Sequence, residues 1–283
     1  MIKKIIALSI LFSFGINTSF AIENGEIDQG TSRVVSLYVE DIMLGCSGYL
    51  YEPRIVLTAA HCVSGQYRIT KVGLPNQKAS PTSEKINVES FMVPENYNKQ
   101  SPYQNDFAVL ILSKSIPVTN NILLFTEEIQ QKIQGLDIQV KIAGYGEQDT
   151  QRTSVMTVRD AHFFYGTLRG ISNEIDIVNE NTGSVCSGDS GGPNTIIYNG
   201  QEVYLGATSH GWNQPNCGRW SGSGAKSLQF DPVYKFLSLI DKAKTIIGPT
   251  AIVETKKQTT TIQTKKSVAK KKCIKLKNGK CKK

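Results

Sequence analysis

The sequence predicts an all-β fold with one terminal helix, on three observations. Short apolar or alternating runs recur along the 283-residue chain. Clusters of Gly, Pro, Asn and Ser, which favour turns, separate these runs. Only one segment has apolar residues at the spacing of a helix. Many short strands joined by turns are typical of antiparallel sheets in a sandwich or a barrel.

The predicted strands follow one another as apolar or alternating runs bounded by turn residues. They are residues 34–39, 55–57, 107–112, 138–143 and 203–207. The one helix begins after Asp231-Pro232, a favourable helix start, and Gly248-Pro249 ends it. Its apolar residues recur about every three or four positions, at Val233, Phe236, Leu237, Ile240 and Ile247. We expect this helix to dock on the β body.

Composition and charge divide the chain into three parts. With 40% hydrophobic and 20% charged residues, the chain is not disordered throughout, and it lacks the pattern of a coiled coil or a collagen. The formal net charge is +8, but residues 249–283 hold 12 lysines and one acidic residue. Residues 22–248 hold 18 basic and 23 acidic residues. The sequence therefore predicts a mildly acidic globular body followed by a cationic tail.

Residues 1–21 have the pattern of a signal peptide. Two lysines precede an apolar run over residues 5–16, and small residues at Ser19 and Ala21 stand three and one before the predicted cut. A permanent membrane anchor would need about 18 apolar residues, and this run is interrupted by polar and glycine residues. No other segment is long and apolar enough for a transmembrane helix. We expect a secreted or periplasmic protein.

The six cysteines would then face an oxidising compartment, where disulfides form. Sequence alone does not choose among their pairings. No pair has the CxxC spacing of a structural zinc site, and the chain has only three histidines. We therefore expect no metal site and no cofactor.

The tail, residues 249–283, is rich in Lys, Thr and Gln and cannot bury enough apolar surface to order itself. Its lysines could bind an anionic cell surface or glycan, or they could simply be solvated. No aromatic residues alternate with them, so specific nucleic-acid binding is not supported. A two-residue turn at Asn278-Gly279 would place Cys281 opposite Leu276. A disulfide between Cys273 and Cys281 would instead need a looser loop.

Two motifs far apart in the chain carry residues suited to nucleophilic catalysis. Residues 188–193 are Gly-Asp-Ser-Gly-Gly-Pro, and residues 58–62 are Thr-Ala-Ala-His-Cys. The Ser190 hydroxyl is a weak nucleophile near neutral pH and needs a base to take its proton. His61 suits that role because histidine titrates near neutral pH. Each residue alone is more often structural, so the combination carries the prediction.

The base in turn needs a carboxylate that fixes its tautomer and stabilises its cation. Asp106 is the candidate, since it opens the apolar run 106–112 and so stands at the start of a buried strand. The glycines around Ser190 allow two backbone N–H groups, those of Gly188 and Ser190, to point at one oxygen. The sequence therefore predicts an oxyanion hole beside the nucleophile.

With these residues the chain resembles the trypsin-like, or chymotrypsin-fold, serine proteases, over about residues 22–248. The order His61, Asp106, Ser190 is that of the family, and residues 144–146, Gly-Tyr-Gly, resemble its turn before the second barrel. The resemblance implies two six-stranded antiparallel β-barrels with the active site between them. It also implies a monomeric endopeptidase with a polypeptide substrate. The alternative is a catalytically silent binding protein that uses its basic tail.

The resemblance further implies how the enzyme becomes active. In the family, a free N-terminal residue folds inward and pairs with the aspartate before the nucleophile. Here these residues are Ile22, directly after the predicted signal cut, and Asp189. We therefore expect signal cleavage itself to produce the active form. Glu23 departs from the apolar second residue that is usual in the family.

By resemblance, Cys46 pairs with Cys62 and Cys186 with Cys217. Side-chain preference would depend on Ser184, with Gly211 and Gly224 as the opposite walls of the pocket. Serine in place of an acidic residue favours large apolar or aromatic substrate side chains over Lys or Arg. Ser209, His210 and Gly211 would line the substrate backbone as a strand. His210 replaces a tryptophan that is usual in the family, and we assign it no catalytic role.

Overall fold

The computed structural model describes residues 22, 25–29, 32–40, 43–65, 68–101, 103–119, 121–146, 159–179, 183–212 and 226–248, with the backbone of 274–275 and 281–282. The predicted signal peptide, most of the tail, Cys217, Gly224 and Cys273 lie outside these residues. The chain divides into two compact units, residues 1–250 and 251–283. No helix in the described ranges is long and apolar enough to cross a membrane.

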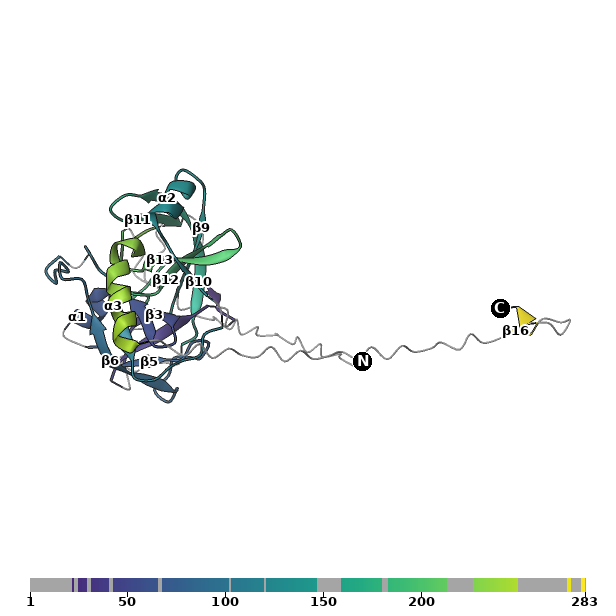
Figure 1. The fold of residues 1–283 in the computed structure, drawn as a ribbon, viewed down its shortest axis with the longest axis horizontal. Coiled ribbons are helices and arrows are strands. Elements are labelled where there is room, and N and C mark those ends of the chain that lie inside the picture. Colours follow the sequence, from purple (N-terminus) through teal and green to yellow (C-terminus); the bar gives the residue numbers. More distant parts are fainter. Residues whose placement is uncertain are drawn as a thin grey trace, which may run out of the picture. The chain divides into compact units, whose positions relative to one another are not determined.

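The first half of the body is a closed six-stranded antiparallel barrel, drawn in purple and blue in Figure 1. Its strands pair in the order β2-β3-β4-β7-β6-β5. Their bounds are β2 Val34–Val39, β3 Met43–Glu52, β4 Ile55–Thr58, β5 Lys71–Gly73, β6 Lys85–Met92 and β7 Ala108–Leu112. Closure leaves no unpaired strand edge in this barrel.

The second half is a nine-stranded sheet, ordered β14-β15-β11-β10-β9-β12-β13-β8, with β1 paired to β10. Only Thr208 and Ser209 separate β13 from β14 in the chain, so the sheet curls back towards its own starting edge. The bounds are β1 Glu26–Ile27, β8 Leu123–Leu124, β9 Gln139–Gly144, β10 His162–Ile171, β11 Ile175–Asn179, β12 Pro193–Tyr198, β13 Gln201–Ala207, β14 His210–Trp212 and β15 Lys226–Phe230. This all-β arrangement confirms the predicted fold class.

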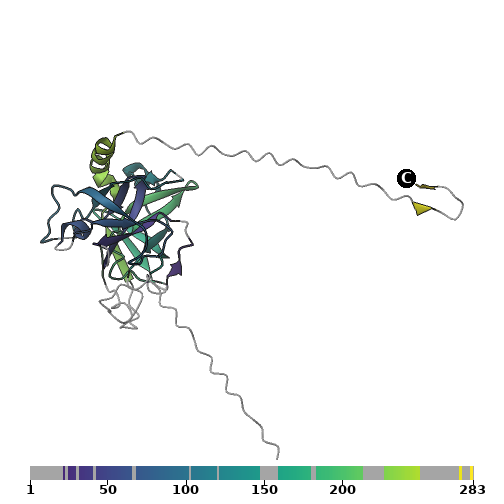
Figure 2. The same ribbon diagram turned by 90° about the horizontal axis from the view of Figure 1, so that it is seen from below.

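Helices occupy the surface of this body, as Figures 1 and 2 show for α3. They are α1 Ala60–Ser64, α2 Glu127–Ile133, the 3-10 helix η1 Val233–Phe236 and α3 Leu237–Ile247. Thr126 caps α2 by accepting a hydrogen bond from the Ile129 N–H. The predicted terminal helix is thus confirmed, with its first turn in 3-10 form. Lys244 of α3 binds Glu52 of β3 at 3.1 Å, which attaches the helix to the barrel.

Strand β7 shows how the core is built. Ala108, Leu110 and Leu112 face the interior of the first barrel. Val109 and Ile111 face a larger cluster that is shared with the second sheet and α3. Alternate side chains point to opposite faces of a strand, and here both faces are buried, which explains why the sequence of this strand is continuously apolar. A strand buried on both faces is a rigid support for Asp106, which lies two residues before its start.

In the tail, two short strands, β16 Ile274–Lys275 and β17 Cys281–Lys282, pair with Lys275 opposite Cys281. The register expected for a two-residue turn, with Leu276 opposite Cys281, is therefore wrong by one residue. The five residues between the strands make a longer connection than that turn provides.

Candidate active site

His61 is the second residue of the short helix α1, which is joined to β4 by Ala59 alone. A disulfide between Cys46 of β3 and Cys62 of α1 attaches this helix to the barrel. The predicted pairing of these two cysteines is therefore present. It places the His61 side chain at a defined point on the barrel wall, with 30% of that side chain exposed.

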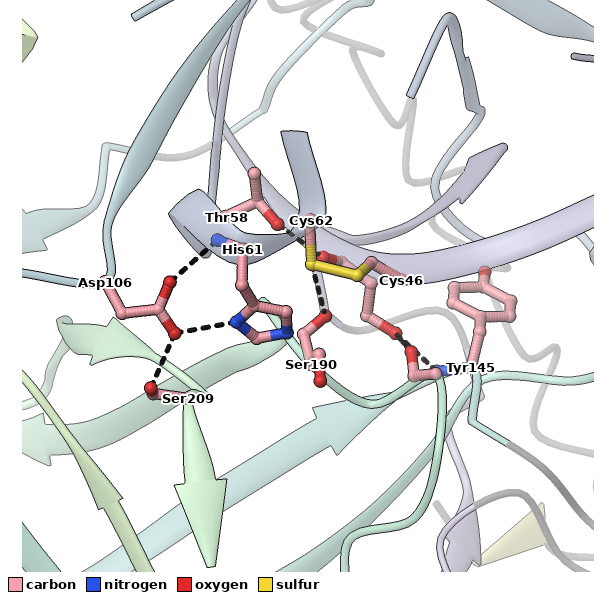
Figure 3. The surroundings of a disulfide bond; sticks show 10 residues. Cys46, Thr58, His61, Cys62, Asp106, Tyr145, Ser190 and Ser209 are labelled. Carbon is pink, nitrogen blue, oxygen red and sulfur yellow. Dashed lines mark hydrogen bonds and ion pairs between the residues drawn. A yellow bond between two sulfur atoms is a disulfide. The ribbon is translucent and has the colours of Figure 1, made fainter. Parts of the chain in front are cut away.

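The Asp106 carboxylate lies against His61, although 45 residues separate the two in sequence. Its Oδ2 is 2.7 Å from Nδ1 of His61, and its Oδ1 accepts the His61 backbone N–H at 2.8 Å. Ser209 donates its hydroxyl to the same Oδ2 at 2.6 Å. The carboxylate is fully buried, and three donors compensate for its loss of water. Figure 3 shows this arrangement.

These bonds determine which imidazole nitrogen is available for chemistry. An ionised carboxylate can only accept, so Nδ1 of His61 donates to Asp106 and Nε2 keeps its lone pair. Tyr97 lies close to the same carboxylate. Burial, together with the negative charge of Asp106, raises the pKa of Tyr97 to about 12, so its phenol stays neutral at physiological pH.

Ser190 lies on a loop that packs against the first barrel. The loop passes through Gly188 at φ +95° and Gly191 at φ +79°, which is backbone geometry that favours glycine. A Cβ on Gly191 would come within 2.0 Å of the Thr58 hydroxyl oxygen, so only glycine fits there. The Ser47 N–H donates to the Ser190 carbonyl at 2.8 Å and fixes the loop.

The His61 ring lies between the Asp106 carboxylate and Ser190, as Figure 3 shows. In the described part of the chain, no hydrogen bond joins the Ser190 hydroxyl to Nε2. Such bonds are often long in substrate-free enzymes and tighten when substrate binds. Among the same residues, no acceptor takes the backbone N–H of Gly188 or of Ser190. Two donors next to the predicted nucleophile are thus available to a ligand.

Asp189, between these two residues, is 1% exposed. Its carboxylate accepts the N–H of Gly146 and that of Cys186, each at 2.7 Å. Ile22 is fully buried, and a Cβ on Gly25 would touch both Ile22 and the Phe163 carbonyl. Phe163 pairs with Ala143, the residue before Gly144. The Asp189 side chain packs directly against Gly144, where a Cβ would collide with its carboxylate. The N-terminal segment and Asp189 thus both lie at the paired ends of β9 and β10.

The predicted substrate-binding residues have different surroundings. Ser184 is 2% exposed, and its hydroxyl lies 3.4 Å from the Val185 carbonyl. Gly211 is exposed on β14, which pairs with β15. The His210 ring contacts the ring of Tyr103, with centroids 4.6 Å apart, and also lies 3.1 Å from Gln229. Gly224 lies outside the described residues.

Two further residues touch this site and were not predicted from the sequence. The Asp231 carboxylate accepts the Asp106 backbone N–H at 3.2 Å and binds Lys235 at 2.7 Å. The Ser47 hydroxyl donates to the Gly188 carbonyl at 2.8 Å. Both residues act across the two halves of the body, 125 and 141 residues away in sequence. Asp231 was marked in the sequence only as part of a helix start, and Ser47 belongs to no local motif, so no signal in the sequence marks their contacts with this site.

Ligand atoms of Cys46, His61 and Cys62 lie within 4.8 Å of one another, in the manner of a metal site. The two sulfurs are bonded to each other and cannot act as thiolates. This donor set therefore does not suit a metal ion. Cys186 is also disulfide-bonded, while Cys217, its expected partner, lies outside the described residues.

Removing the Cys46–Cys62 bridge should destabilise the fold. In the double variant Cys46→Ala, Cys62→Ala, the free energy of unfolding should fall by about 3 kcal/mol. Without the bridge, which spans a sequence separation of 16 residues, the unfolded chain regains the entropy that closing this loop removes. Urea unfolding followed by tryptophan fluorescence measures the change. The buried Ser36→Ala variant is the control for loss of a polar contact in the same barrel. A double variant as stable as the wild type would contradict this expectation.

A family model described as Trypsin matches residues 22–229. Among known proteins, Brachyurin of Leptuca pugilator is 32% identical over 191 residues, which is 62% of this chain and 79% of that protein. Trypsin beta of Drosophila erecta is 26% identical over 208 residues, covering 67% and 79% of the two chains. Chymotrypsin-like elastase family member 1 of Rattus norvegicus is 28% identical over 181 residues, covering 58% and 67%.

Proposed function

Because this chain belongs to the trypsin family and is a serine endopeptidase, we propose that Ser190, His61 and Asp106 are its catalytic triad. The observation that carries the proposal is the buried contact of Asp106 with Nδ1 of His61 at 2.7 Å, with Ser190 beside the same ring. That contact leaves Nε2 unprotonated and therefore able to act as a base.

In the proposed reaction, Ser190 Oγ attacks the carbonyl carbon of the scissile peptide bond while Nε2 of His61 takes the hydroxyl proton. The resulting imidazolium, stabilised by Asp106, gives that proton to the leaving amine as the C–N bond breaks. An ester between Ser190 and the acyl part of the substrate remains. Water, activated by His61, then hydrolyses the ester and regenerates the Ser190 hydroxyl.

The negative oxygen of each tetrahedral intermediate would be held by the N–H groups of Gly188 and Ser190. The absence of a described acceptor for either N–H supports this role. Donors that are fixed before the reaction stabilise the charge without reorganising, which makes such sites effective.

For substrate binding, we propose that the peptide adds to β14 as an antiparallel strand. β14 is an end strand of the described sheet, where it pairs with β15, and the peptide would add along its other edge. Ser184, Gly211 and Gly224 would form the pocket for the side chain before the scissile bond. Since none of the three carries a charge, we propose a preference for large apolar or aromatic side chains.

We also propose that the enzyme acts outside the cytoplasm and that removal of residues 1–21 activates it. The free ammonium group of Ile22 would then pair with the Asp189 carboxylate. The burial of both residues beside β9 and β10 supports this pairing. A buried charge of either sign is costly without its partner, so the two groups should depend on each other.

Cleavage of a mixed peptide library by the mature protein, read by mass spectrometry beside Ser190→Ala, tests this function. We expect cuts after large apolar or aromatic residues by the wild type and none by the variant. Equal cleavage by both proteins would refute the proposed nucleophile. Cuts after Lys or Arg would refute the pocket assignment alone. A mature protein that cleaves nothing would favour the silent binding protein.

A further inference from the structure

Ser47 of β3 connects three separate segments around the nucleophile. It is fully buried and follows Cys46, the cysteine of the disulfide beside His61. Its backbone N–H donates to the Ser190 carbonyl, and its hydroxyl donates to the Gly188 carbonyl, both at 2.8 Å. The same hydroxyl oxygen accepts the Tyr145 N–H at 2.8 Å.

The direction of these bonds is unambiguous. A carbonyl oxygen can only accept and a backbone N–H can only donate. The Ser47 proton therefore goes to Gly188, and a lone pair of its oxygen takes the Tyr145 N–H. Every polar group of Ser47 is used, since its own carbonyl accepts the Thr58 hydroxyl at 2.8 Å.

The hydrogen bond from Ser47 to the Gly188 carbonyl restricts the backbone of Gly188. Gly188, at φ +95°, has no side chain to hold its orientation, and glycine reaches both signs of φ easily. The turn is closed on its other side by the Asp189 N–H, which donates to the Cys186 carbonyl at 3.0 Å. The Gly188 carbonyl lies in the peptide plane that Gly188 shares with Asp189, so the Ser47 contact holds that plane directly. It limits rotation about the Gly188 backbone, and in this way it restricts the direction of the Gly188 N–H in the neighbouring plane.

The Tyr145 end of the contact reaches Asp189. The next residue, Gly146, donates its N–H to the Asp189 carboxylate at 2.7 Å. One buried hydroxyl thus connects β3 of the first barrel to both segments that surround the nucleophile, the loop from Gly188 to Ser190 and the Tyr145–Gly146 turn.

We propose that Ser47 is a positioning residue that aims the Gly188 N–H at the substrate oxyanion. This inference rests on the proposed function, in which the N–H groups of Gly188 and Ser190 hold that oxygen. Ser47 touches neither substrate nor reacting atoms and acts only through the loop. Its effect should therefore appear in the transition state, where the oxyanion develops, and not in the ground-state complex.

The test compares Ser47→Ala with Ser36→Ala. Ser36 is the cross-strand partner of Ser47 on β2, is 2% exposed, and its hydroxyl binds Tyr38 instead of the nucleophile loop. Each variant loses one buried hydroxyl from the same barrel. Rates are normalised to active sites titrated to completion with a fluorophosphonate, so unfolded molecules do not count.

For Ser47→Ala we expect kcat to fall about 10-fold while KM stays within about twofold, because only the alignment of an oxyanion donor is lost. Affinity for a peptide aldehyde, whose hemiacetal oxygen would occupy the oxyanion hole, should fall by a similar factor. Ser36→Ala should change neither quantity, and Ser47→Thr, which keeps the hydroxyl, should recover most of kcat.

Unchanged kcat and aldehyde affinity in Ser47→Ala would overturn the inference, as would equal losses in Ser36→Ala. The Ser190→Ala variant separates this failure from failure of the proposed function. If Ser190→Ala is inactive while Ser47→Ala is fully active, only the role of Ser47 is wrong. If Ser190→Ala keeps its activity, the proposed triad is wrong and the role of Ser47 falls with it.

Discussion

The Asp106→Asn variant is expected to lose about four orders of magnitude in kcat with its fold intact, as Ser-His-Asp triads generally do. The carboxylate accepts the His61 ring N–H, the His61 backbone N–H and the Ser209 hydroxyl. An asparagine has only one acceptor oxygen and would present an NH₂ group to at least one of these donors. The imidazole would then change tautomer and place a proton on Nε2, where the base is needed.

Steady-state hydrolysis of a chromogenic peptide measures this loss, and thermal unfolding checks the fold. Asp241→Asn is the matched control, since Asp241 is exposed on α3 and its side chain makes no contact with the site. A loss of less than about tenfold in Asp106→Asn would contradict the proposed triad, because a wrongly protonated base cannot support normal turnover.

The second large effect is expected at the proposed activation pair. Asp189→Asn should lower kcat/KM by about 10²- to 10³-fold, as expected when one partner of a buried ion pair is removed. The ammonium group of Ile22 would be left without its counter-charge. The carboxylate also accepts the Gly146 and Cys186 N–H groups, so the loop that carries Gly188 and Ser190 would lose support as well.

A variant that removes the Ile22 ammonium group, the other partner of the proposed pair, is the matched comparison for Asp189→Asn. A mature chain that starts one residue early, at Ala21, has the same side chains but no ammonium group on Ile22. It should be as inactive as Asp189→Asn, while the chain that starts at Ile22 is active. Intact-mass spectrometry verifies each start. Full activity of the extended chain would show that activation does not depend on this pair.

Local sequence patterns predicted the reactive residues and some of the elements, namely five strands and the terminal helix, but not others such as β3, β10 and the helix α2. The runs at 34–39 and 203–207 became β2 and β13, because apolar segments bounded by turn residues must be buried as strands. The apolar residues from Val233 to Ile247 recur every three or four positions, which places them on one face of a helix, and they form η1 and α3. Gly191 was in a motif that only glycine can complete, since its φ is positive and its Cβ position is filled.

The order of the strands in the second sheet could not be read in this way. Strand β9 pairs with β10 and with β12, and β15 inserts between β11 and β14. These pairings join segments that lie far apart in the chain, and backbone hydrogen bonds carry no residue-specific signal. The resemblance to a family implied a second six-stranded barrel, but it gave neither this strand order nor the nine-stranded sheet that the structure describes.

What the sequence determined by itself is therefore the set of chemical groups and the local backbone that presents them, namely Ser190 in its glycine turn and His61 after β4. What only the tertiary structure decided is the partners of those groups. Ser209 reaches Asp106 across 103 residues, and Ser47 reaches Gly188 across 141. A serine has the same appearance in the sequence whether its hydroxyl faces water or a catalytic loop. Its role depends on which acceptor lies within about 3 Å, and packing of the two halves of the body sets that distance.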